Sequence, residues 1–222
     1  METIFNDKIV DRVRINNNHA KIITIEGIDG AGKTTIVNNL IKEIANLGYK
    51  VEHFNTSSLY NIYWDTVKSG INKGIIDKDV NQLLHNLAFL TYIKTIFIDK
   101  LNKNDFVISE WYIYGKMVLS ELYSGKEECI SKKILQNELE EGNIVLPNYS
   151  FYLEIDPNIA YKRILSRNGD MEEKEKIEML IKASDIWERY VQLYDIIRLD
   201  ASSSVEDICK RVLKRVFRQN EK

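Results

Sequence analysis

The sequence predicts an α/β fold, in which a parallel sheet is covered by helices on both faces. Short runs of apolar, β-branched residues alternate with longer segments of helical periodicity, and consecutive parallel strands need such crossover helices. A glycine-rich turn also joins the first of these runs to a helix. The 222 residues suit one domain with a core covered on both sides, and no internal repeat or clear linker divides them.

The first half of the chain supplies two of the predicted strands. Ile22–Glu26 is an apolar, β-branched run that is typical of a buried strand. An amphipathic helix is expected from about Thr34 to Leu47, and Gly48 stands where a glycine commonly ends a helix. Val51–Phe54 predicts the second strand. Two segments with helical periodicity follow, over residues 59–72 and 79–103. The second segment is long and strongly apolar.

The second half continues the same alternation. Three further apolar runs predict strands, at Phe106–Ser109, Phe151–Ile155 and Ile196–Leu199. The helices expected around them cover residues near 113–123, 130–141 and 172–194. Asp156–Pro157 begins another helix, because proline is favoured in a first turn. Ser204 is expected to cap a last helix, whose first turn carries Glu206 and Asp207.

Composition and charge narrow the class of protein. Acids and bases nearly balance, and the net charge of −2 gives no overall attraction to nucleic acid or to a membrane surface. Cys129 and Cys209 lack metal-ligand spacing and are weak evidence for a disulfide. Neither a signal-like opening nor an apolar run of transmembrane length is present, so we expect a cytoplasmic protein. Residues 1–20 are expected to form an N-terminal extension before one domain over residues 21–222.

One motif carries chemistry by itself. Residues 27–34 match the pattern G-x-x-x-x-G-K-[ST], in which backbone N–H groups cradle nucleotide phosphates and glycines allow close approach. The motif follows a predicted strand and opens a predicted helix, which favours an ATP-binding loop over a glycine-rich turn without a ligand. The residues expected to contact the nucleotide are Gly27, Ile28, Asp29, Gly30, Ala31, Gly32, Lys33, Thr34 and Thr35.

Three side chains are expected to act on the phosphates and a metal ion. Lys33 can bridge the β- and γ-phosphates of ATP, and the Thr34 hydroxyl can bind Mg²⁺. A second acid is expected near the metal, and Glu110 is the best candidate, since ligands of open α/β sheets collect at the carboxyl ends of the strands. The alternative for Glu110 is an ordinary solvated acid at the end of a strand.

The phosphate loop and its surroundings resemble the thymidylate kinases of bacteria. The run Ile23–Thr35 is similar to the opening of that family, and the similarity extends across most of residues 21–216. Val107–Ser109 resembles the strand before the family's Asp-Arg-Tyr motif, and Phe151–Pro157 resembles its fourth strand and turn. The resemblance implies a three-layer α/β/α P-loop kinase fold with a five-stranded parallel sheet and a helical lid, often assembled as a homodimer.

The resemblance also implies further residues on the ATP side. A lid is expected over about residues 160–176. Arg163 and Arg167 match lid arginines and would act as catalytic residues that close over the γ-phosphate, whereas the alternative for both is an exposed basic helix turn. Ala201 lies in the run Leu199–Ser202, which is similar to the loop near the adenine base.

The acceptor side departs from the family pattern. The family's Asp-Arg-Tyr is Glu-Trp-Tyr at residues 110–112. The family's Asp-Arg pair that contacts thymidylate falls on Ala88 and Phe89 when residues are counted back without gaps, and residues 55–58 replace an Arg-Glu-Pro segment. Arginine is the preferred bidentate partner of phosphate. These changes therefore favour an acceptor with less need for phosphate recognition, such as a nucleoside or another small hydroxyl metabolite.

Five residues are expected to contact or orient the acceptor. Phe89, Trp111 and Tyr112 would line a more apolar pocket, and the alternative for such aromatic residues is core packing. Asp29 and Glu26 lie where either could orient the attacking oxygen. Three functions stay open at this point: a thymidylate or related nucleoside monophosphate kinase with a changed acceptor site, a kinase of a nucleoside or non-nucleotide metabolite, and an ATP-binding module without catalysis.

Overall fold

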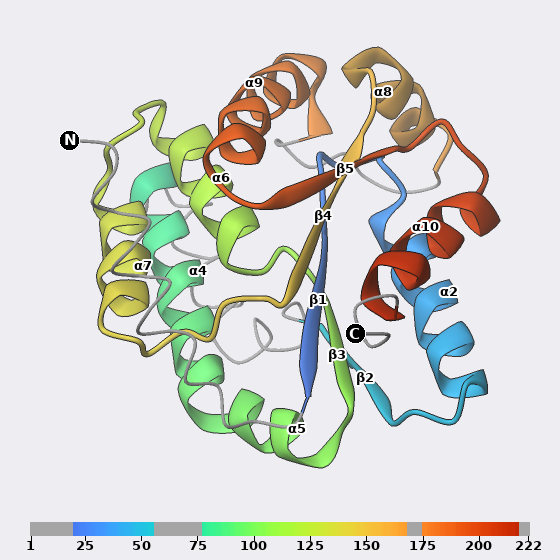
Figure 1. The fold of residues 1–222 in the computed structure, drawn as a ribbon. Helices are drawn as coiled ribbons and strands as arrows, with labels where there is room; N and C mark the ends of the chain where they lie inside the picture. Colours follow the sequence, from blue (N-terminus) through green and yellow to red (C-terminus); the bar gives the residue numbers. More distant parts are fainter. Residues whose placement is uncertain (1–19, 56–76, 168–174, 218–222) are drawn as a thin grey trace.

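A computed structural model of the chain describes residues 20–55, 77–167 and 175–217 (Figure 1). Within them, five parallel strands form one sheet in the order β2-β3-β1-β4-β5. The strands are β1 (Lys21–Glu26), β2 (Val51–Phe54), β3 (Phe106–Glu110), β4 (Tyr149–Glu154) and β5 (Ile196–Asp200). The predicted α/β fold with a five-stranded parallel sheet is confirmed.

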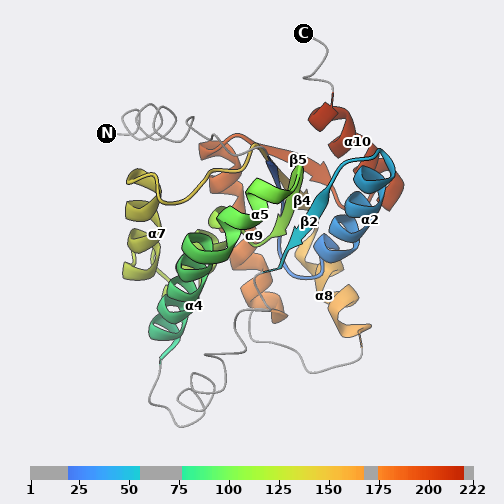
Figure 2. The same cartoon turned by 90° about the horizontal axis from the view of Figure 1, so that it is seen from below.

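Helices cover both faces of the sheet, as Figures 1 and 2 show from two directions. On one face α2 (Lys33–Asn46) packs on β1, β2 and β3, with α10 (Val205–Phe217) beside it. On the other face a central helix, α6, contacts α4, α7 and α9. The bounds of the remaining helices are α4 (Lys78–Tyr92), α5 (Ile98–Lys103), α6 (Ile113–Ser124), α7 (Ile130–Glu140), α8 (Pro157–Leu165) and α9 (Ile177–Leu193).

The register of the strands brings acidic residues to one edge of the sheet. β1 is buried along nearly its whole length because helices cover both of its sides. In the parallel ladders Ile25 pairs with Glu110 and Glu26 pairs with Tyr152. The carboxyl ends of β1 and β3 therefore lie side by side, and the loop that follows β1 is next to Glu110.

The helix predicted over residues 79–103 is present but is not regular. A π-helical turn, η2 (Ile93–Phe97), separates α4 from α5. Ile93, Phe97 and Leu101 recur every four residues, and all three are buried. Residues four apart share one face of a regular α-helix as well, and here they keep one face across the π turn. The Phe97 ring then lies 4.4 Å from the Phe54 ring, centroid to centroid.

Several predicted segments lie outside the described residues. They are most of the N-terminal extension, the helix over 59–72, the last part of the lid and the first residues of the helix over 172–194. The remaining strands and helices are found within a few residues of their predicted bounds.

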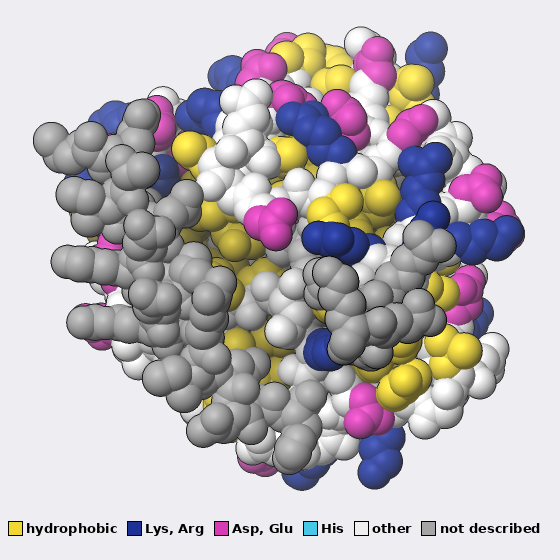
Figure 3. All heavy atoms as spheres, in the orientation of Figure 1, with side chains coloured by type: hydrophobic (Ala, Val, Ile, Leu, Met, Phe, Trp, Pro, Cys, Tyr) yellow, Lys and Arg dark blue, Asp and Glu magenta, His cyan; other side chains and the backbone are white. Residues whose placement is uncertain are grey.

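The described part of the surface seen in Figure 3 carries both signs of charge. Lys and Arg side chains alternate with Asp and Glu side chains, without a large area of one sign. This mixture agrees with the nearly balanced composition. Among the residues that the structure describes, none of the helices is both long and apolar enough to cross a membrane.

Candidate active site

The phosphate loop connects β1 to α2 at the carboxyl edge of the sheet. Gly30 has a φ of 81°, and a Cβ atom there would lie 2.5 Å from the backbone oxygen of Ala160 in α8. Both the conformation and the available space therefore require glycine. Gly32 precedes the first residue of α2, so the N-terminus of that helix opens onto the loop. A helix N-terminus presents free N–H groups and favours a bound anion.

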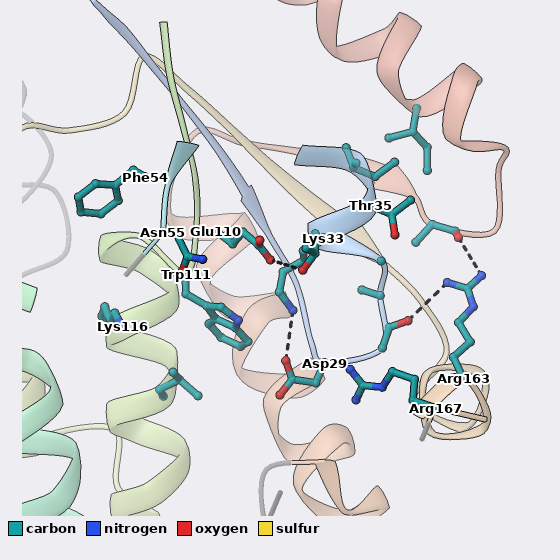
Figure 4. Close-up of a pocket in the computed structure, with 18 of the residues that line it drawn as sticks. Asp29, Lys33, Thr35, Phe54, Asn55, Glu110, Trp111, Lys116, Arg163 and Arg167 are labelled. Atoms are coloured by element: carbon teal, nitrogen blue, oxygen red, sulfur yellow. Dashed lines mark hydrogen bonds and ion pairs between the residues drawn. The ribbon is translucent and has the colours of Figure 1, made fainter. Parts of the chain in front are cut away.

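Lys33 is buried within the loop and faces its carbonyl groups. Its Nζ donates to the backbone oxygens of Gly27 at 3.0 Å and Ile28 at 2.9 Å, and it lies 3.4 Å from Oδ1 of Asp29 (Figure 4). The same Nζ is 4.5 Å from the centroid of the Trp111 ring. An ammonium over an indole face is an attractive arrangement. Trp111 is thus close to the phosphate loop.

Thr34 and Glu110 meet across the edge of the sheet. The Thr34 hydroxyl donates to Oε2 of Glu110 at 2.9 Å. Nε2 of His53 lies 3.6 Å from the other oxygen of Glu110, which is too long for a hydrogen bond. Burial lowers the pKa of His53, although the charge of Glu110 opposes this shift. A hydroxyl and a carboxylate beside a phosphate loop are oxygen ligands of the kind that Mg²⁺ accepts.

Arg163 on α8 joins three parts of the site. Its guanidinium donates to the backbone oxygen of Gly30 at 3.5 Å and to that of Ala201 at 3.2 Å (Figure 4). Arg167, one turn later, pairs with Glu175. Ala201 is itself fixed because its N–H donates to the Glu154 backbone oxygen at the end of β4. The start of the predicted lid therefore lies against the phosphate loop.

A cleft of about 920 Å³ runs over these groups. Two walls face each other across it, with Glu110 between them. The P-loop wall is formed by Asp29–Ile36, Arg163, Arg167, Ala201, Ser203, Val205 and Ile208. The α4/α6 wall is formed by Phe54, Asn55, Asn81, Gln82, His85, Trp111, Lys116, Leu119 and Tyr123.

Trp111 occupies a strained position between β3 and α6. Its φ of 54° is the one left-handed value among the described residues other than glycine, and such a conformation costs on the order of 1 kcal/mol. A Cβ atom on Gly115 would lie 2.8 Å from Cε3 of Trp111, so the indole packs directly on the first turn of α6. The missing side chain at Gly115 leaves room for the ring, which lines the cleft.

Glu26 is fully buried beneath the two walls. Its Oε1 accepts a hydrogen bond from the Tyr112 backbone N–H at 3.1 Å, whereas Oε2 has no hydrogen-bond partner. Burial raises the pKa of Glu26 to about 7, despite the hydrogen bond from Tyr112 and the charges of Lys33 and Lys116. A carboxyl group in this position holds the start of α6 and does not reach the cleft.

The structure brings together some of the predicted acceptor residues and not others. Asp29 and Trp111 line the cleft. Phe89 and Tyr112 lie in the core, 1% and 0% exposed, with their ring centroids 5.6 Å apart. The Tyr112 hydroxyl donates to the Val145 backbone oxygen at 2.8 Å. This placement agrees with the core-packing alternative for Phe89 and Tyr112.

The α4/α6 wall contains residues that the sequence alone did not predict for the site. Lys116, Leu119 and Tyr123 lie three and four residues apart, so they share one face of α6. On α4, Asn81 and Gln82 precede His85 by four and three residues, so each lies about one turn from it. The spacing in the sequence predicts that these residues share a helix face. It does not predict that this face lines the cleft, which depends on how the two helices pack.

Comparison with known proteins agrees with this geometry. A family model described as thymidylate kinase matches residues 25–212. The chain is 28% identical over 196 residues to the thymidylate kinase of Coprothermobacter proteolyticus, covering 87% of this chain and 97% of the relative. It is 29% identical to the thymidylate kinase of Buchnera aphidicola, covering 86% and 93%. For that of Leptospira interrogans the identity is 26%, covering 94% and 98%.

The matched region contains the phosphate loop, Glu110 and the start of the lid. Since it spans most of the chain and the sheet has the expected order, the chain belongs to the thymidylate kinase family of P-loop kinases.

Proposed function

We propose that this enzyme transfers the γ-phosphate of ATP to a nucleoside monophosphate, with dTMP as the first acceptor to test. The observation that carries the proposal is one cleft in which Thr34 of the P-loop wall is bonded to Glu110, with the α4/α6 wall on the other side of Glu110. Such a cleft has room for a donor and an acceptor that face each other. The names of the relatives, all thymidylate kinases, support dTMP as the acceptor.

On the donor side, the chain's part is to position phosphates and to neutralise charge. The N–H groups of the loop would hold the β- and γ-phosphates. The Lys33 ammonium would exchange its loop carbonyls for phosphate oxygens, which are stronger partners for a cation. Arg163 and Arg167 would close over the γ-phosphate, and Ala201 would lie beside the adenine base.

Thr34 and Glu110 are the residues that fit Mg²⁺. Their oxygens are already within hydrogen-bond distance of each other at the phosphate loop. Mg²⁺ is usually held in kinases by one or two protein oxygens together with phosphates and water, so this small donor set is sufficient. When bound, the ion would neutralise charge on the transferred phosphoryl group.

The transfer step itself needs little from the protein if the acceptor is a phosphate. An acceptor phosphate oxygen would form the new bond to the γ-phosphorus while the bond to the β–γ bridging oxygen breaks, and ADP leaves. No proton has to be removed, because the acceptor phosphate is already ionised. Asp29 lines the cleft and Glu26 does not, so we assign the orienting role to Asp29.

A second candidate function is phosphorylation of a nucleoside or another hydroxyl compound. It is favoured by Trp111, which replaces an arginine of the family, and by the amide side chains of the α4/α6 wall. A hydroxyl acceptor loses a proton during transfer, and Asp29 would then serve as general base. The third function, an ATP-binding module without catalysis, is opposed by the complete set of Lys33, Thr34 and Glu110.

Steady-state formation of ADP with dTMP, thymidine, dCMP and AMP as acceptors tests the proposal. We expect dTMP to be turned over at ordinary kinase rates, and omission of Mg²⁺ or the change Lys33→Ala to abolish the reaction. Preference for thymidine would favour the second function. Absence of turnover with every acceptor, despite ATP binding, would favour the third function.

Assembly as a homodimer and a cytoplasmic location stay predictions. Sedimentation of the purified chain tests whether it forms a homodimer.

A further inference from the structure

Lys116 is a buried cation on the wall opposite the phosphate loop. It lies in the first turn of α6, where its N–H donates to the Tyr112 backbone oxygen at 2.9 Å. The residue is 4% exposed and lines the cleft. In the view of Figure 4, Lys116 and Lys33 lie on opposite sides of Trp111.

Burial of an ammonium group is costly unless its surroundings compensate for lost water. Here the Phe89 ring lies 5.7 Å from Nζ of Lys116, and the charge of Lys116 also acts on Glu26. Lys116 is therefore held at the cleft within a buried environment that contains a ring and a carboxyl group. The amino end of α6 adds further positive potential beside Lys116.

Another buried lysine of this region lies away from the cleft. Lys132 on α7 lies 2.7 Å from Oε1 of Glu121, and Glu121 also pairs with Arg189 and accepts from the Tyr190 hydroxyl. Lys132 does not line the cleft and closes a buried ion-pair network between α6, α7 and α9. Lys116 instead lines the cleft.

The remaining basic side chains belong to the opposite wall. Of the Lys and Arg residues among the described lining of the cleft, Lys33, Arg163 and Arg167 lie on the P-loop wall, and Lys116 alone comes from the α4/α6 wall. Trp111, at the family's arginine position, supplies no charge. The negatively charged group of a ligand that binds beside α4 and α6 would therefore be expected next to Lys116.

We infer that Lys116 binds the phosphate group of the acceptor nucleotide and so sets a preference for a monophosphate over its nucleoside. This inference rests on the proposed function and adds the residue that recognises the acceptor. One ammonium gives a point contact, in place of the bidentate grip that an arginine provides. The α4/α6 wall would thus keep an anionic acceptor while it has lost the family's arginine.

The test compares Lys116→Met, Lys116→Arg and Lys133→Met, since Lys133 is exposed on α7 and lies outside the cleft. For Lys116→Met we expect the KM for dTMP to rise about tenfold to a hundredfold, because contacts to a charged group are lost. The KM for ATP should change less than about twofold. Lys116→Arg should recover most of the loss, and Lys133→Met should behave as the unmodified enzyme.

A second measurement uses ligand-induced stabilisation with dTMP alone and thymidine alone. The unmodified chain should be stabilised more by dTMP, and this difference should disappear in Lys116→Met. If Lys116→Met does not fold, Lys116→Gln decides by the same difference. An unchanged KM for dTMP in a folded variant overturns the inference while the proposed function stands. Equal or stronger binding of thymidine by the unmodified chain overturns it as well, and absence of turnover with every acceptor overturns the proposed function instead.

Discussion

The P-loop wall and the α4/α6 wall are built from different kinds of polar groups. The P-loop wall combines backbone N–H groups at the start of α2 with Lys33, Arg163 and Arg167. The α4/α6 wall combines the amides of Asn55, Asn81 and Gln82 with aromatic rings and one ammonium. The first wall suits a chain of phosphates, and the second suits a molecule with a single anionic group and several neutral polar groups.

This difference suggests a reason why residues of the α4/α6 wall could be substituted while the phosphate loop keeps its motif. Phosphates common to all nucleoside triphosphates are held by the backbone of one continuous loop, which requires a contiguous motif. Under the proposed function, an acceptor would be held by side chains from β2, α4, α6 and the segment between β3 and α6, which meet only in the folded chain. Substitutions on the second wall can alter the acceptor without disturbing the first, and variants confined to one wall test this division.

Removal of the Lys33 ammonium should have the largest effect. Lys33→Ala is expected to lower kcat by roughly a thousandfold, because a preorganised positive charge beside the transferred phosphoryl group is lost. The KM for dTMP should change less than about threefold, since the acceptor is held by the other wall. Steady-state kinetics measure both values.

Lys42→Ala is the matched control, because Lys42 is exposed on the same helix. It should leave both values unchanged. A kcat within tenfold of the unmodified enzyme for Lys33→Ala would contradict the phosphate role. A large rise in the KM for dTMP would show that the two walls do not act separately.

Alanine substitution of one glycine in each wall tests how much each wall tolerates an added side chain. Gly30→Ala should destabilise the fold by about 3 kcal/mol, because its Cβ would meet the backbone of Ala160 and the φ of 81° disfavours any side chain. Gly115→Ala should cost about 1 kcal/mol, because its Cβ would meet the side-chain atoms Oε2 of Glu26 and Cε3 of Trp111, and alanine also favours the helix. Urea denaturation measures both losses, and the reverse order would contradict the comparison.

Glu26, which is buried beneath both walls, predicts that the free energy of unfolding depends on pH. The raised pKa of Glu26 means that the folded state binds more protons than the unfolded state between about pH 4.5 and 7. Stability therefore falls as the pH rises through this window, and the full penalty is present above pH 7. Glu26→Gln keeps an acceptor for the Tyr112 N–H and should raise the free energy of unfolding at pH 8 by about 1–3 kcal/mol.

The gain from Glu26→Gln should shrink as the pH is lowered and vanish near pH 4.5. Chemical denaturation at both pH values measures it, and Glu140→Gln, at an exposed position of α7, is the control. The charged or titratable groups that act on Glu26 are Lys33, Lys116 and Glu110, and they are unchanged in the variant. A gain that is the same at both pH values would mean that Glu26 is not the titrating group.

The sequence predicts the parts of the fold and site that depend on local pattern. The strands are recognisable as β-branched runs, and the phosphate loop is contiguous, so both were located to within a few residues. The π turn was not predicted, because residues 93, 97 and 101 would share one face of a regular α-helix as well.

The α4/α6 wall was less accessible because it is assembled from separate elements. Counting back from Glu110 drew attention to Phe89, but its side chain points into the core. Lys116 follows Trp111 by five residues and was not selected, because a lysine in a helix is usually exposed. Only the packing of α6 against α4 and the lining of the cleft show that Lys116 is buried there.

The smallest expected effect concerns the lid and tests how far the P-loop wall extends. Arg163 joins α8 to the phosphate loop and to Ala201 through two backbone oxygens. Arg163→Ala should lower kcat about tenfold, because the lid arginine neutralises phosphate charge only after the lid closes. The KM for dTMP should stay within about twofold, since none of the α4/α6 wall is touched.

Lys162→Ala, at an exposed position of the same helix outside the cleft, should behave as the unmodified enzyme. If both variants lost kcat equally, the cause would be damage to α8 and not the Arg163 guanidinium. If Arg163→Ala raised the KM for dTMP more than it lowered kcat, the lid would have to be counted with the acceptor, and the division between the walls would no longer hold.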